Sequence, residues 1–549
     1  MRSIALLLLL PLALLASAQN APSQVSVKLL AINDFHGQLE APAGPGEIGG
    51  VAAGGAAYLA AHIRTLQAAH PHTVFVSAGD LINASPFASA LFQDEPTIEA
   101  MNEMGLALNA VGNHEFDEGV AELRRMQAGG CHPQHGCRFR QGFGGARFEF
   151  LAANVVNEAT GQTLFPAYAV REFDGVRVAF ICMTLQATGN MVSADGIAGW
   201  SFRNEWQTAN ALVPQIRAQG IEAIVLLIHE GGFTTSGYDD CPGLSGPIVE
   251  IVPRLDPAID AVITGHTHRA YNCRVDGRLV TSAGALGRIF TEIDLTLDRA
   301  SGDVIRAAAR NHIVTRDLAP HPVVAAVVEE ARRAAAAHDR VCGELTAPAT
   351  REGQLARDVR AGASGDSALG RLVADAQLWA TAPPARGGAQ IAFMNPGGLR
   401  EDLVPGAGGA VRYSQLFAVH PFGNQLVTMT LTGAQIRELL EQQFPGYSNA
   451  QPYERILQAS RGFSYAWSAR SPPGRRVQEM RLDGAALDPA GRYRVTVNSF
   501  LASGGDKFSV LAQGSDRQAG MSDVDALEAY FRATGPVTPD PHIRITRAP

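Results

Sequence analysis

The sequence predicts an α/β protein with two domains. Its 549 residues correspond to two to four domains at roughly 150 residues per domain. From residue 25 to about residue 297, apolar strand-like runs such as VSVKLLAI, HTVFVSAG and IEAIVLLI alternate with helical patterns, which is typical of a layered α/β domain. A second α/β pattern begins near residue 343, with the strand-like runs AQIAFMN, QLVTMTL and YRVTVNS.

A helix is expected between the two patterns. The stretch from Pro322 to Arg340 is rich in Ala, Glu and Arg, which have high helix propensity, and Gly343 follows it. We therefore expect a first domain over residues 25–318, an interdomain helix within 319–342 and a second domain over 343–549. Further helices are expected near 367–380 and 433–443.

Composition and charge exclude several classes of protein. Apolar residues make up 46% of the chain and charged residues 18%, as in globular proteins and unlike disordered or multi-span membrane proteins. The formal net charge is -8. Such mild acidity gives no support for binding a polyanion, so we expect no nucleic acid partner.

Residues 1–18 have the pattern of a secretory signal peptide. Arg2 precedes an apolar run from Ile4 to Ala16, and the residues up to Ala18 fit a small-residue cleavage site. The run is shorter than the roughly 20 residues of a membrane span. No cysteine for lipidation follows it, and no hydrophobic tail for a glycolipid anchor is present. We expect a mature chain beginning at Gln19, without a membrane anchor, in the periplasm or secreted.

Cysteine usage fits an oxidising compartment. Cys131 and Cys137 are close in sequence within a Gly/His/Pro-rich loop, which predicts a disulfide; a zinc site there is the less favoured alternative. Cys241 and Cys273 could form a second bridge. Cys182 lies in the apolar run VRVAFICM and is expected to be a buried thiol.

Five short polar segments follow the predicted strands of the first domain. Ligands of α/β proteins gather at the carboxyl ends of strands, so these segments are expected to converge. Asp34 and His36 are two residues apart, as are His266 and His268, and in an extended chain that spacing puts both side chains on one face. The segments are NDFHG (33–37), GD (79–80), GNHEFD (112–117), HEGG (229–232) and GHTH (265–268).

The donors in these segments favour a metal centre. Carboxylate, amide and imidazole groups together suit borderline ions such as zinc or manganese. Seven ligands exceed the need of one tetrahedral ion, so we expect two divalent ions with a shared carboxylate. A single such motif is more often a hydrogen-bonded turn, whereas their joint occurrence in this order favours a dinuclear site. The candidate ligands are Asp34, His36, Asp80, Asn113, His229, His266 and His268.

The order NDFHG, GD, GNHEFD, H, GHTH resembles that of the calcineurin-like metallophosphoesterases, and specifically the secreted bacterial 5′-nucleotidase and UDP-sugar hydrolase family. The resemblance extends over nearly the whole mature chain. It implies a four-layer α/β/β/α metallophosphoesterase domain and a C-terminal α/β substrate-binding domain, with a hinge near residues 318–345 that brings them together for catalysis.

The resemblance also implies a role for each candidate ligand. One ion would be held by Asp34, His36, Asp80 and His268, and the other by Asp80, Asn113, His229 and His266, so that Asp80 bridges. His114 is then left for acid/base catalysis near the leaving oxygen, oriented by Asp117 three residues later.

Three C-terminal segments resemble the substrate loops of the same family: MNPGGLR (394–400), HPFGN (420–424) and NSFLASGGD (498–506). By this likeness, Phe422 and Phe500 would sandwich a nucleobase. Asn395 would hydrogen-bond to the base, Arg400 would bind the phosphate, and Asp506 would accept hydrogen bonds from the ribose hydroxyls.

The chain departs from the family pattern at one position. Gly365 stands where the family commonly has an additional phosphate-binding arginine before the helix that begins near residue 367. The nearest upstream arginines are Arg357 and Arg360, and this departure leaves the preference for phosphate-chain length open.

The activity implied by the resemblance is that of an exported dinuclear-metal phosphohydrolase. It would release phosphate from nucleoside 5′-monophosphates by in-line attack of a metal-bridging hydroxide, with nucleotide di- and triphosphates or UDP-sugars as further candidate substrates. The expected partner is a small-molecule nucleotide, and the sequence carries no signal for an oligomeric state. Two alternatives are a 2′,3′-cyclic-nucleotide phosphodiesterase with 3′-nucleotidase activity and a non-catalytic nucleotide-binding protein.

Overall fold

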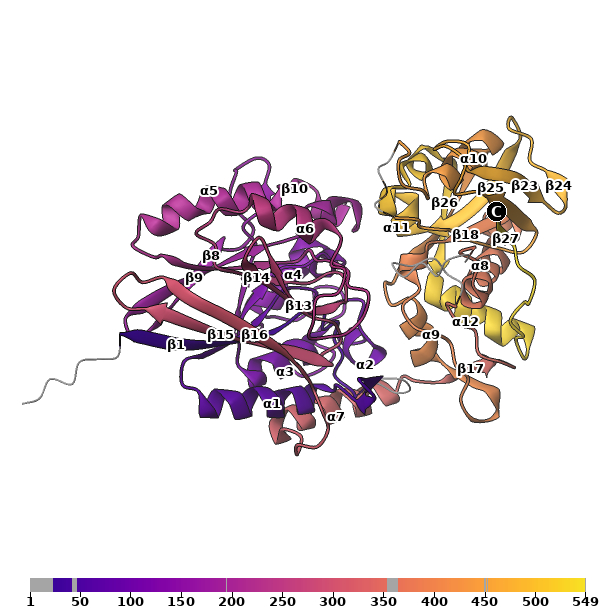
Figure 1. Ribbon diagram of the computed structural model, residues 1–549. Helices are drawn as coiled ribbons and strands as arrows, with labels where there is room; N and C mark the ends of the chain where they lie inside the picture. The colour runs from indigo at the N-terminus through magenta and orange to yellow at the C-terminus, as the bar shows by residue number, and fades with distance from the viewer. Residues whose placement is uncertain are drawn as a thin grey trace, which may run out of the picture.

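The structure is a computed structural model that describes residues 23–41, 47–193, 195–352, 364–448, 451 and 453–548. The expected signal peptide over residues 1–18 lies outside these residues. The chain forms two α/β domains, drawn from indigo to pink and from orange to yellow in Figure 1.

The first sheet of the N-terminal domain has six strands in the order β16-β15-β1-β4-β5-β6. Parallel pairing joins β1 to β4, β4 to β5 and β5 to β6, while β15 and β16 add antiparallel strands at the other side. The strands span Gln24–Ile32 (β1), Thr73–Ser77 (β4), Leu106–Ala110 (β5), Glu149–Leu151 (β6), Ile289–Asp298 (β15) and Val304–Ile313 (β16).

The second sheet also has six strands, in the order β13-β14-β12-β11-β9-β8. Its central strands β9, β11, β12 and β14 are parallel, and β8 and β13 pair antiparallel at the edges. The strands span Tyr168–Phe173 (β8), Val176–Met183 (β9), Ala223–Ile228 (β11), Ala261–Thr264 (β12), Ala270–Val275 (β13) and Arg278–Ala283 (β14).

Alternation along the strands sorts apolar side chains into separate layers. Leu29 packs between the two sheets with Phe180, whereas its neighbour Leu30 packs against the outer helices with Leu59. The outer layers contain α1 (Ala56–Ala69), α3 (Glu95–Met104), α4 (Gly119–Ala128) and α7 (Pro322–Ala336) on one side and α5 (Glu205–Arg217) and α6 (Pro247–Ile251) on the other. The expected four-layer α/β/β/α arrangement is confirmed.

Helix α7 lies within the stretch from Pro322 to Arg340 in which the sequence predicts a helix. It begins at Pro322, a favoured first helical residue because proline lacks the N–H that would be unpaired there. It packs against α1, α2 (Phe87–Ala90) and α3, and β17 (Val341–Glu344) follows it into the C-terminal domain (Figure 1).

The C-terminal domain contains two larger sheets, besides the antiparallel pair of β17 with β19 (Ala410–Arg412). A five-stranded sheet has the order β21-β18-β25-β20-β26, and a four-stranded sheet the order β24-β23-β22-β27. Both share one apolar core with α10 (Gly433–Glu441). The strands span Ile391–Met394 (β18), Gln425–Thr432 (β20), Gln458–Ala459 (β21), Phe463–Trp467 (β22), Val477–Leu482 (β23), Ala485–Ala486 (β24), Arg492–Asn498 (β25), Ser515–Ser522 (β26) and Ile545–Arg547 (β27).

Shorter elements and the remaining helices complete the fold. Helix α8 lies where a helix was expected near 367–380, with the Ser367 side chain capping its N-terminus. The strands and α-helices not yet described are β2 (Glu47–Ile48), β3 (Val51–Ala52), β7 (Val155–Asn157), β10 (Trp200–Phe202), α8 (Ala368–Thr381), α9 (Tyr413–Val419), α11 (Ser499–Ala502) and α12 (Asp523–Thr534).

The cysteines behave as expected. Disulfides join Cys131 to Cys137 and Cys241 to Cys273. Cys182 is buried in β9, and Cys342, for which the sequence suggests no partner, is a buried thiol that hydrogen-bonds to Glu528.

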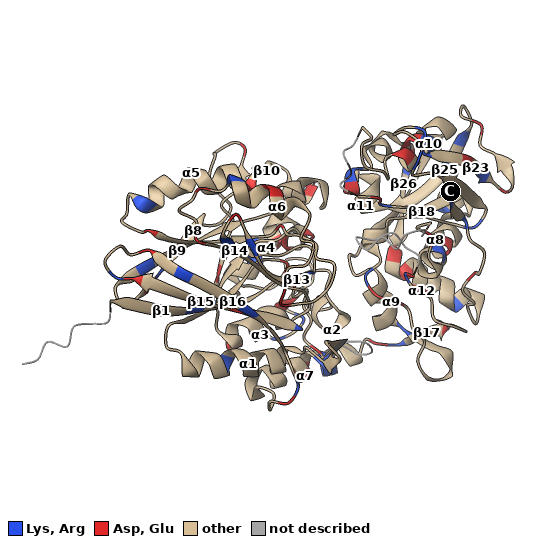
Figure 2. Ribbon diagram, in the orientation of Figure 1, with Lys and Arg blue, Asp and Glu red and all other residues tan. Residues whose placement is uncertain are grey.

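Within the described ranges, no helix combines the length and apolar character that crossing a bilayer requires. Figure 2 shows Lys and Arg scattered among Asp and Glu in both domains.

Candidate metal centre and substrate cleft

The polar segments of the N-terminal domain lie where its parallel strands end. Asp34 follows β1, Asp80 follows β4 and Asn113 follows β5, all in the first sheet. His229 follows β11 directly, and His266 lies two residues after β12, both in the second sheet. Because these strand ends point to one edge of the layered core, the five side chains are brought together from sequence positions far apart.

The conformation of these segments differs from the expected one. Asp34, His36, His266 and His268 have φ values of 50°, 49°, 69° and 55°, and Asp80 has 52°. The expectation that extended chain places each His/Asp or His/His pair on one face is therefore wrong. The strands end before the pairs, and the chain then turns through left-handed backbone, which L-residues rarely adopt and which surrounding structure must hold.

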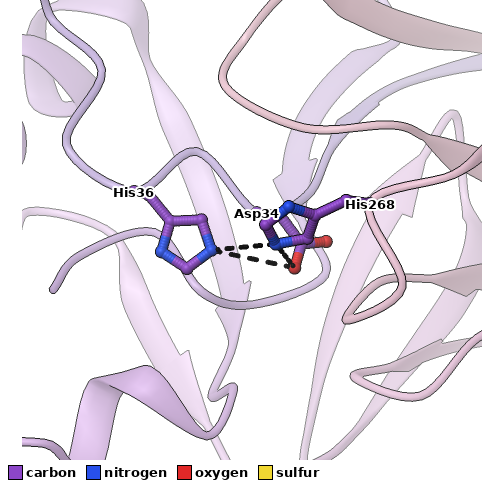
Figure 3. A group of neighbouring side chains, drawn as sticks. All are labelled: Asp34, His36 and His268. Atoms are coloured by element: carbon purple, nitrogen blue, oxygen red, sulfur yellow. Dashed lines mark hydrogen bonds and ion pairs between the residues drawn. The ribbon is translucent and has the colours of Figure 1, made fainter. Parts of the chain in front are cut away.

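Asp34, His36 and His268 form one group of possible ligands (Figure 3). Nε2 of His36 lies 3.2 Å from Nε2 of His268, which in turn lies 3.3 Å from Oδ1 of Asp34. Nδ1 of His36 hydrogen-bonds to the Asn83 carbonyl at 2.9 Å, so Nε2 faces the group. Asn33, a residue the sequence analysis did not single out, donates from Nδ2 to Oδ2 of Asp34 at 2.6 Å.

Asp80, His229 and His266 form a second group. Nε2 of His229 lies 2.9 Å from Oδ2 of Asp80, and its Nδ1 hydrogen-bonds to the Ala78 carbonyl at 2.8 Å. Oδ2 of Asp80 also lies 3.8 Å from Nε2 of His36. Asp80 thus lies between the two groups, as a bridging ligand must.

Two buried polar atoms support a fit to metal ions. Oδ1 of Asn113 and Nε2 of His229 have no hydrogen-bond partner among the described residues, and the approach of His229 to Asp80 lacks hydrogen-bond geometry. Buried polar atoms in native proteins nearly always have a partner. An oxygen and an imidazole nitrogen next to carboxylates and further imidazoles suit zinc or manganese. The residues present therefore fit a pair of divalent ions.

In this site, burial and neighbouring charges shift the pKa values of the side chains in opposite directions. Burial lowers the pKa of His36 well below its usual value. Burial favours the neutral form of Asp80, but the neighbouring His229 holds the pKa of that carboxyl well below its ordinary range. Burial lowers the pKa of His229 as well, yet the Asp80 carboxylate raises it to about 10. Cations entering the site would have to displace the proton of His229.

Glu115 positions the Asp80 loop and was missed by the sequence analysis. Its carboxylate accepts hydrogen bonds from the backbone N–H groups of Asp80, Leu81 and Gly112, at 2.7 to 3.0 Å. Burial, then the charge of Asp80, raises the pKa of Glu115 to about 7. Glu115 lies within the segment GNHEFD, but the sequence does not indicate its hydrogen bonds, because they depend on how the Asp80 loop folds against it.

His114 lies beside the ligand groups and pairs with Asp117. Its Nδ1 is 2.7 Å from Oδ2 of Asp117, its backbone N–H donates to Oδ1 of Asp80 at 2.9 Å, and its ring centroid is 5.0 Å from that of His36. Burial lowers the pKa of His114, but the carboxylates of Asp117 and Asp80 outweigh it and raise that pKa above its usual value.

One cleft of about 810 Å³ joins this centre to the C-terminal domain. The ring of Phe422 stacks on that of His114, with centroids 5.9 Å apart, and the Arg400 guanidinium lies 5.7 Å from the Phe422 ring centroid. All five expected substrate-binding residues line the cleft: Asn395, Arg400, Phe422, Phe500 and Asp506. Their roles in binding substrate stay predictions.

Asp506 is held by its neighbours. Oδ2 accepts from Nδ2 of Asn395 at 2.9 Å, and Oδ1 pairs with Nη1 of Arg455. Asn395 in turn accepts from Nδ2 of Asn498 at 3.0 Å. Arg455 and Tyr453 also line the cleft, although neither belongs to a motif that can be recognised in the sequence.

The structure leaves no room for a side chain at position 365, where the family commonly has a phosphate-binding arginine. Gly365 has φ of 91°, and a Cβ there would lie 2.6 Å from Cβ of Ile456. Arg357 and Arg360 lie outside the described residues. The described arginines that line the cleft are Arg269, Arg351, Arg400 and Arg455.

Two family models match the chain. The calcineurin-like phosphoesterase model matches residues 27–270, and the model of the 5′-nucleotidase C-terminal domain matches residues 341–513.

Similar proteins include enzymes and a cell wall protein. Endonuclease YhcR of Bacillus subtilis is 30% identical over 531 residues, which cover 94% of this chain but only 40% of YhcR. Cell wall protein Lmo0130 of Listeria monocytogenes is 31% identical over 547 residues, covering 94% of this chain and 68% of that protein. The crystal structure of a 5′-nucleotidase precursor from Thermus thermophilus aligns with a TM-score of 0.77 at 26% identity, covering 95% of this chain and 99% of that one.

Taken with the strand-end centre and the adjoining cleft, these matches identify the chain as a metallophosphoesterase. It belongs to the 5′-nucleotidase family, in which a calcineurin-like phosphoesterase domain precedes a 5′-nucleotidase C-terminal domain.

Proposed function

We propose that this chain is an exported phosphohydrolase that uses two divalent ions, zinc or manganese, to release phosphate from nucleoside 5′-monophosphates. The observation that carries the proposal is the shared cleft, in which His114 of the N-terminal domain contacts Phe422 of the C-terminal domain. Its volume of about 810 Å³ falls within the range of roughly 300 to 1,000 Å³ typical of small-molecule sites.

The two ligand groups would each hold one ion. Asp34, His36 and His268 would serve the first, Asn113, His229 and His266 the second, and Asp80 both. Ions bound there would neutralise negative charge on the phosphoryl group and lower the pKa of bound water. The hydrogen bonds that Nδ1 of His36 donates to the Asn83 carbonyl and Nδ1 of His229 donates to the Ala78 carbonyl fix the orientation of those two rings.

His114 would act on the leaving oxygen. Asp117 accepts the Nδ1 proton of His114 in a 2.7 Å hydrogen bond, so the opposite nitrogen, Nε2, is the one that can give a proton to the departing 5′-oxygen. Arg400 lines the same cleft beside Phe422 and would bind the phosphate oxygens with its planar fork of donors.

The C-terminal residues would hold the nucleoside. Phe422 and Phe500 offer flat faces on which a base can stack, a contact worth about 1 to 3 kcal/mol per base. Asn395 would bond to the base, and Asp506 faces the cleft as an acceptor for ribose hydroxyls.

A substrate panel with purified, metal-loaded protein tests the activity. Phosphate release from AMP should exceed release from 3′-AMP and 2′,3′-cyclic AMP, and UDP-glucose measures the UDP-sugar activity. EDTA should abolish turnover, and zinc or manganese should restore it. Preference for 3′-AMP or cyclic AMP would favour the phosphodiesterase alternative, and nucleotide binding without any turnover would favour the non-catalytic one.

Export is tested separately. Mass spectrometry of the protein recovered from periplasm or medium should give an N-terminus at Gln19. Recovery of uncleaved protein from the cytoplasm would contradict export.

A further inference from the structure

The wall of the cleft contains a buried ion pair whose arginine, Arg455, has no role in the proposed function. The side chains of Arg455 and Asp506 are only 10% and 8% exposed, and both line the cleft. An ion pair in such a place is costly to desolvate and contributes little to stability by itself. Its place on the cleft surface suggests a role in recognition.

Asp506 does not face the ribose site as an isolated carboxylate. One of its oxygens pairs with Arg455 and the other accepts from Asn395. The backbone is fixed as well, because Gln451 donates from Nε2 to the Asp506 carbonyl and Asp506 has a left-handed φ of 54°. This end of the cleft therefore presents a guanidinium and a carboxylate together.

The guanidinium is held in place by an aromatic ring and has a second cation near it. Its carbon lies 4.9 Å from the ring centroid of Tyr453, which also lines the cleft. The second cation is Lys507, the residue after Asp506 in the chain, and burial, then the charge of Arg455, lowers its pKa. The carboxylate of Asp506 thus has the Arg455 guanidinium as a direct ion-pair partner on the cleft wall.

Nucleotide sites use these two residue types for different ribose chemistry. An acidic residue accepts hydrogen bonds from free ribose hydroxyls, whereas an arginine accommodates a phosphate on the ribose. Guanidinium presents five N–H donors in one plane and can hold a carboxylate and a phosphate at the same time.

We propose that Arg455 makes this cleft selective for nucleotides with a second phosphate on the ribose, at the 2′ or 3′ oxygen, while the 5′-phosphate is at the metal centre. This inference rests on the proposed function, because it takes Asp506 to face the ribose. In the reaction, water adds to the 5′ phosphorus, the bond from phosphorus to O5′ breaks, and O5′ takes a proton. The products are orthophosphate and a nucleoside 2′- or 3′-phosphate.

The test compares adenosine 3′,5′-bisphosphate and adenosine 2′,5′-bisphosphate with AMP as substrates of the metal-loaded enzyme. The expected kcat/KM is roughly tenfold or more higher for at least one bisphosphate than for AMP, as one charge-assisted contact allows. Chromatography should identify adenosine 3′- or 2′-phosphate as the product. Formation of AMP from a bisphosphate would overturn the inference, as would a higher kcat/KM for AMP than for both bisphosphates.

Variants connect the selectivity to Arg455. Arg455→Gln should lower the ratio of bisphosphate to AMP kcat/KM roughly tenfold or more, and Arg455→Lys, which keeps the charge but lacks the planar set of donors, should retain only part of it. Arg351→Gln is the matched control, since Arg351 lines the same cleft but pairs with Asp402, and it should leave the ratio unchanged. An unchanged ratio in Arg455→Gln would overturn the inference.

Removing Arg455 alone leaves the buried Asp506 carboxylate without its cation and could impair folding. The double variant Arg455→Gln/Asp506→Asn removes both charges and should show the same loss of ratio. Equilibrium binding of the bisphosphates and AMP, measured by calorimetry, separates this inference from the proposed function. If no nucleotide is hydrolysed, the proposed function fails, whereas tighter binding of a bisphosphate that depends on Arg455 still supports the inference and its absence overturns it.

Discussion

The imidazole of His114 stacks on the phenyl ring of Phe422, with 5.9 Å between the ring centroids and 22° between the ring planes. The two residues come from different domains and lie more than 300 positions apart in the sequence. Their contact places the proposed proton donor beside the proposed base-binding residue, so a substitution at either position should affect both catalysis and nucleotide binding.

Replacing His114 by alanine should separate catalysis from metal binding. Because His114 contributes a proton in the proposed reaction, His114→Ala should lower kcat by a factor of about 10² to 10⁴ while metal content stays at the wild-type level. Metal analysis by mass spectrometry and steady-state kinetics measure the two quantities.

The outcome for metal content decides between two roles of His114. Its ring also lies within reach of His36 and Asp80 as a possible ligand. Asp117→Asn is the control, since it keeps the imidazole but changes its hydrogen-bond partner, and it should cause a smaller loss of kcat. Loss of metal from His114→Ala would make this residue a ligand instead of a proton donor.

A methyl group at position 112 should disrupt the metal centre. A Cβ on Gly112 would lie 2.3 Å from Oδ1 and 2.5 Å from the backbone N of Asp80. Gly112→Ala should therefore displace the bridging carboxylate and weaken metal binding roughly 10- to 100-fold. Titration with the metal, monitored by calorimetry, measures this change in affinity.

Gly144→Ala is the matched control. A Cβ there would meet no atom within 4 Å, and Gly144 has no left-handed backbone that would favour glycine. Wild-type metal affinity in Gly112→Ala, or an equal loss in both variants, would contradict a central role for Asp80.

The sequence predicts the buried strands well because their signal is local. The run of β11 is continuously apolar over the length of a strand, and those of β1, β9 and β20 are mostly apolar with few polar residues between. Strands β15 and β16 carry alternating polar side chains. Arg306 is exposed to solvent, and Asn311 hydrogen-bonds to Asp239 in a loop, so a search for apolar runs does not reveal these strands.

The site was predictable in its residues but less so in its geometry. The ligand types and their order along the chain are local features, and so is the spacing of His114 and Asp117. The left-handed backbone at Asp34 and His266 is imposed by packing of the surrounding loops, and the pairing of Arg455 with Asp506 joins residues 51 positions apart. Such contacts arise only once the chain has folded.

The two disulfides should differ in their effect on stability. Cys241 and Cys273 are separated by 32 residues and Cys131 and Cys137 by 6, and a cross-link restricts the unfolded chain more when it closes a longer loop. Replacing both cysteines by serine should cost about 3 to 4 kcal/mol for the first pair and about 2 kcal/mol for the second.

Chemical unfolding of the two double-serine variants, each compared with the wild type, measures these costs. The pair Cys241–Cys273 also ties the loop that follows His229 to β13, so its loss should lower metal affinity, whereas loss of the distant Cys131–Cys137 bridge should not. A larger destabilisation for the shorter loop would contradict this account.

Asp260 should make stability depend on pH. Burial raises the pKa of Asp260 to about 7, above the value near 3.8 of an unhindered aspartate, although its Oδ2 accepts a 2.8 Å hydrogen bond from the N–H of Ile224. Between these two pKa values the folded protein holds a proton that the unfolded chain has lost. The free energy of unfolding contributed by this group is therefore fully present below about pH 4 and is lost as pH rises through about 7.

Asp260→Asn removes the titration while keeping a carbonyl oxygen for Ile224. Relative to the wild type, the variant should gain about 1 to 3 kcal/mol of unfolding free energy between pH 5 and pH 8, since each pH unit contributes at most about 1.4 kcal/mol. Other buried acids, such as Glu115 with a pKa raised to about 7, titrate in both proteins and cancel in the difference. Urea unfolding at the two pH values measures this difference, and a value that stays constant with pH would show that Asp260 ionises alike in the folded and unfolded chain.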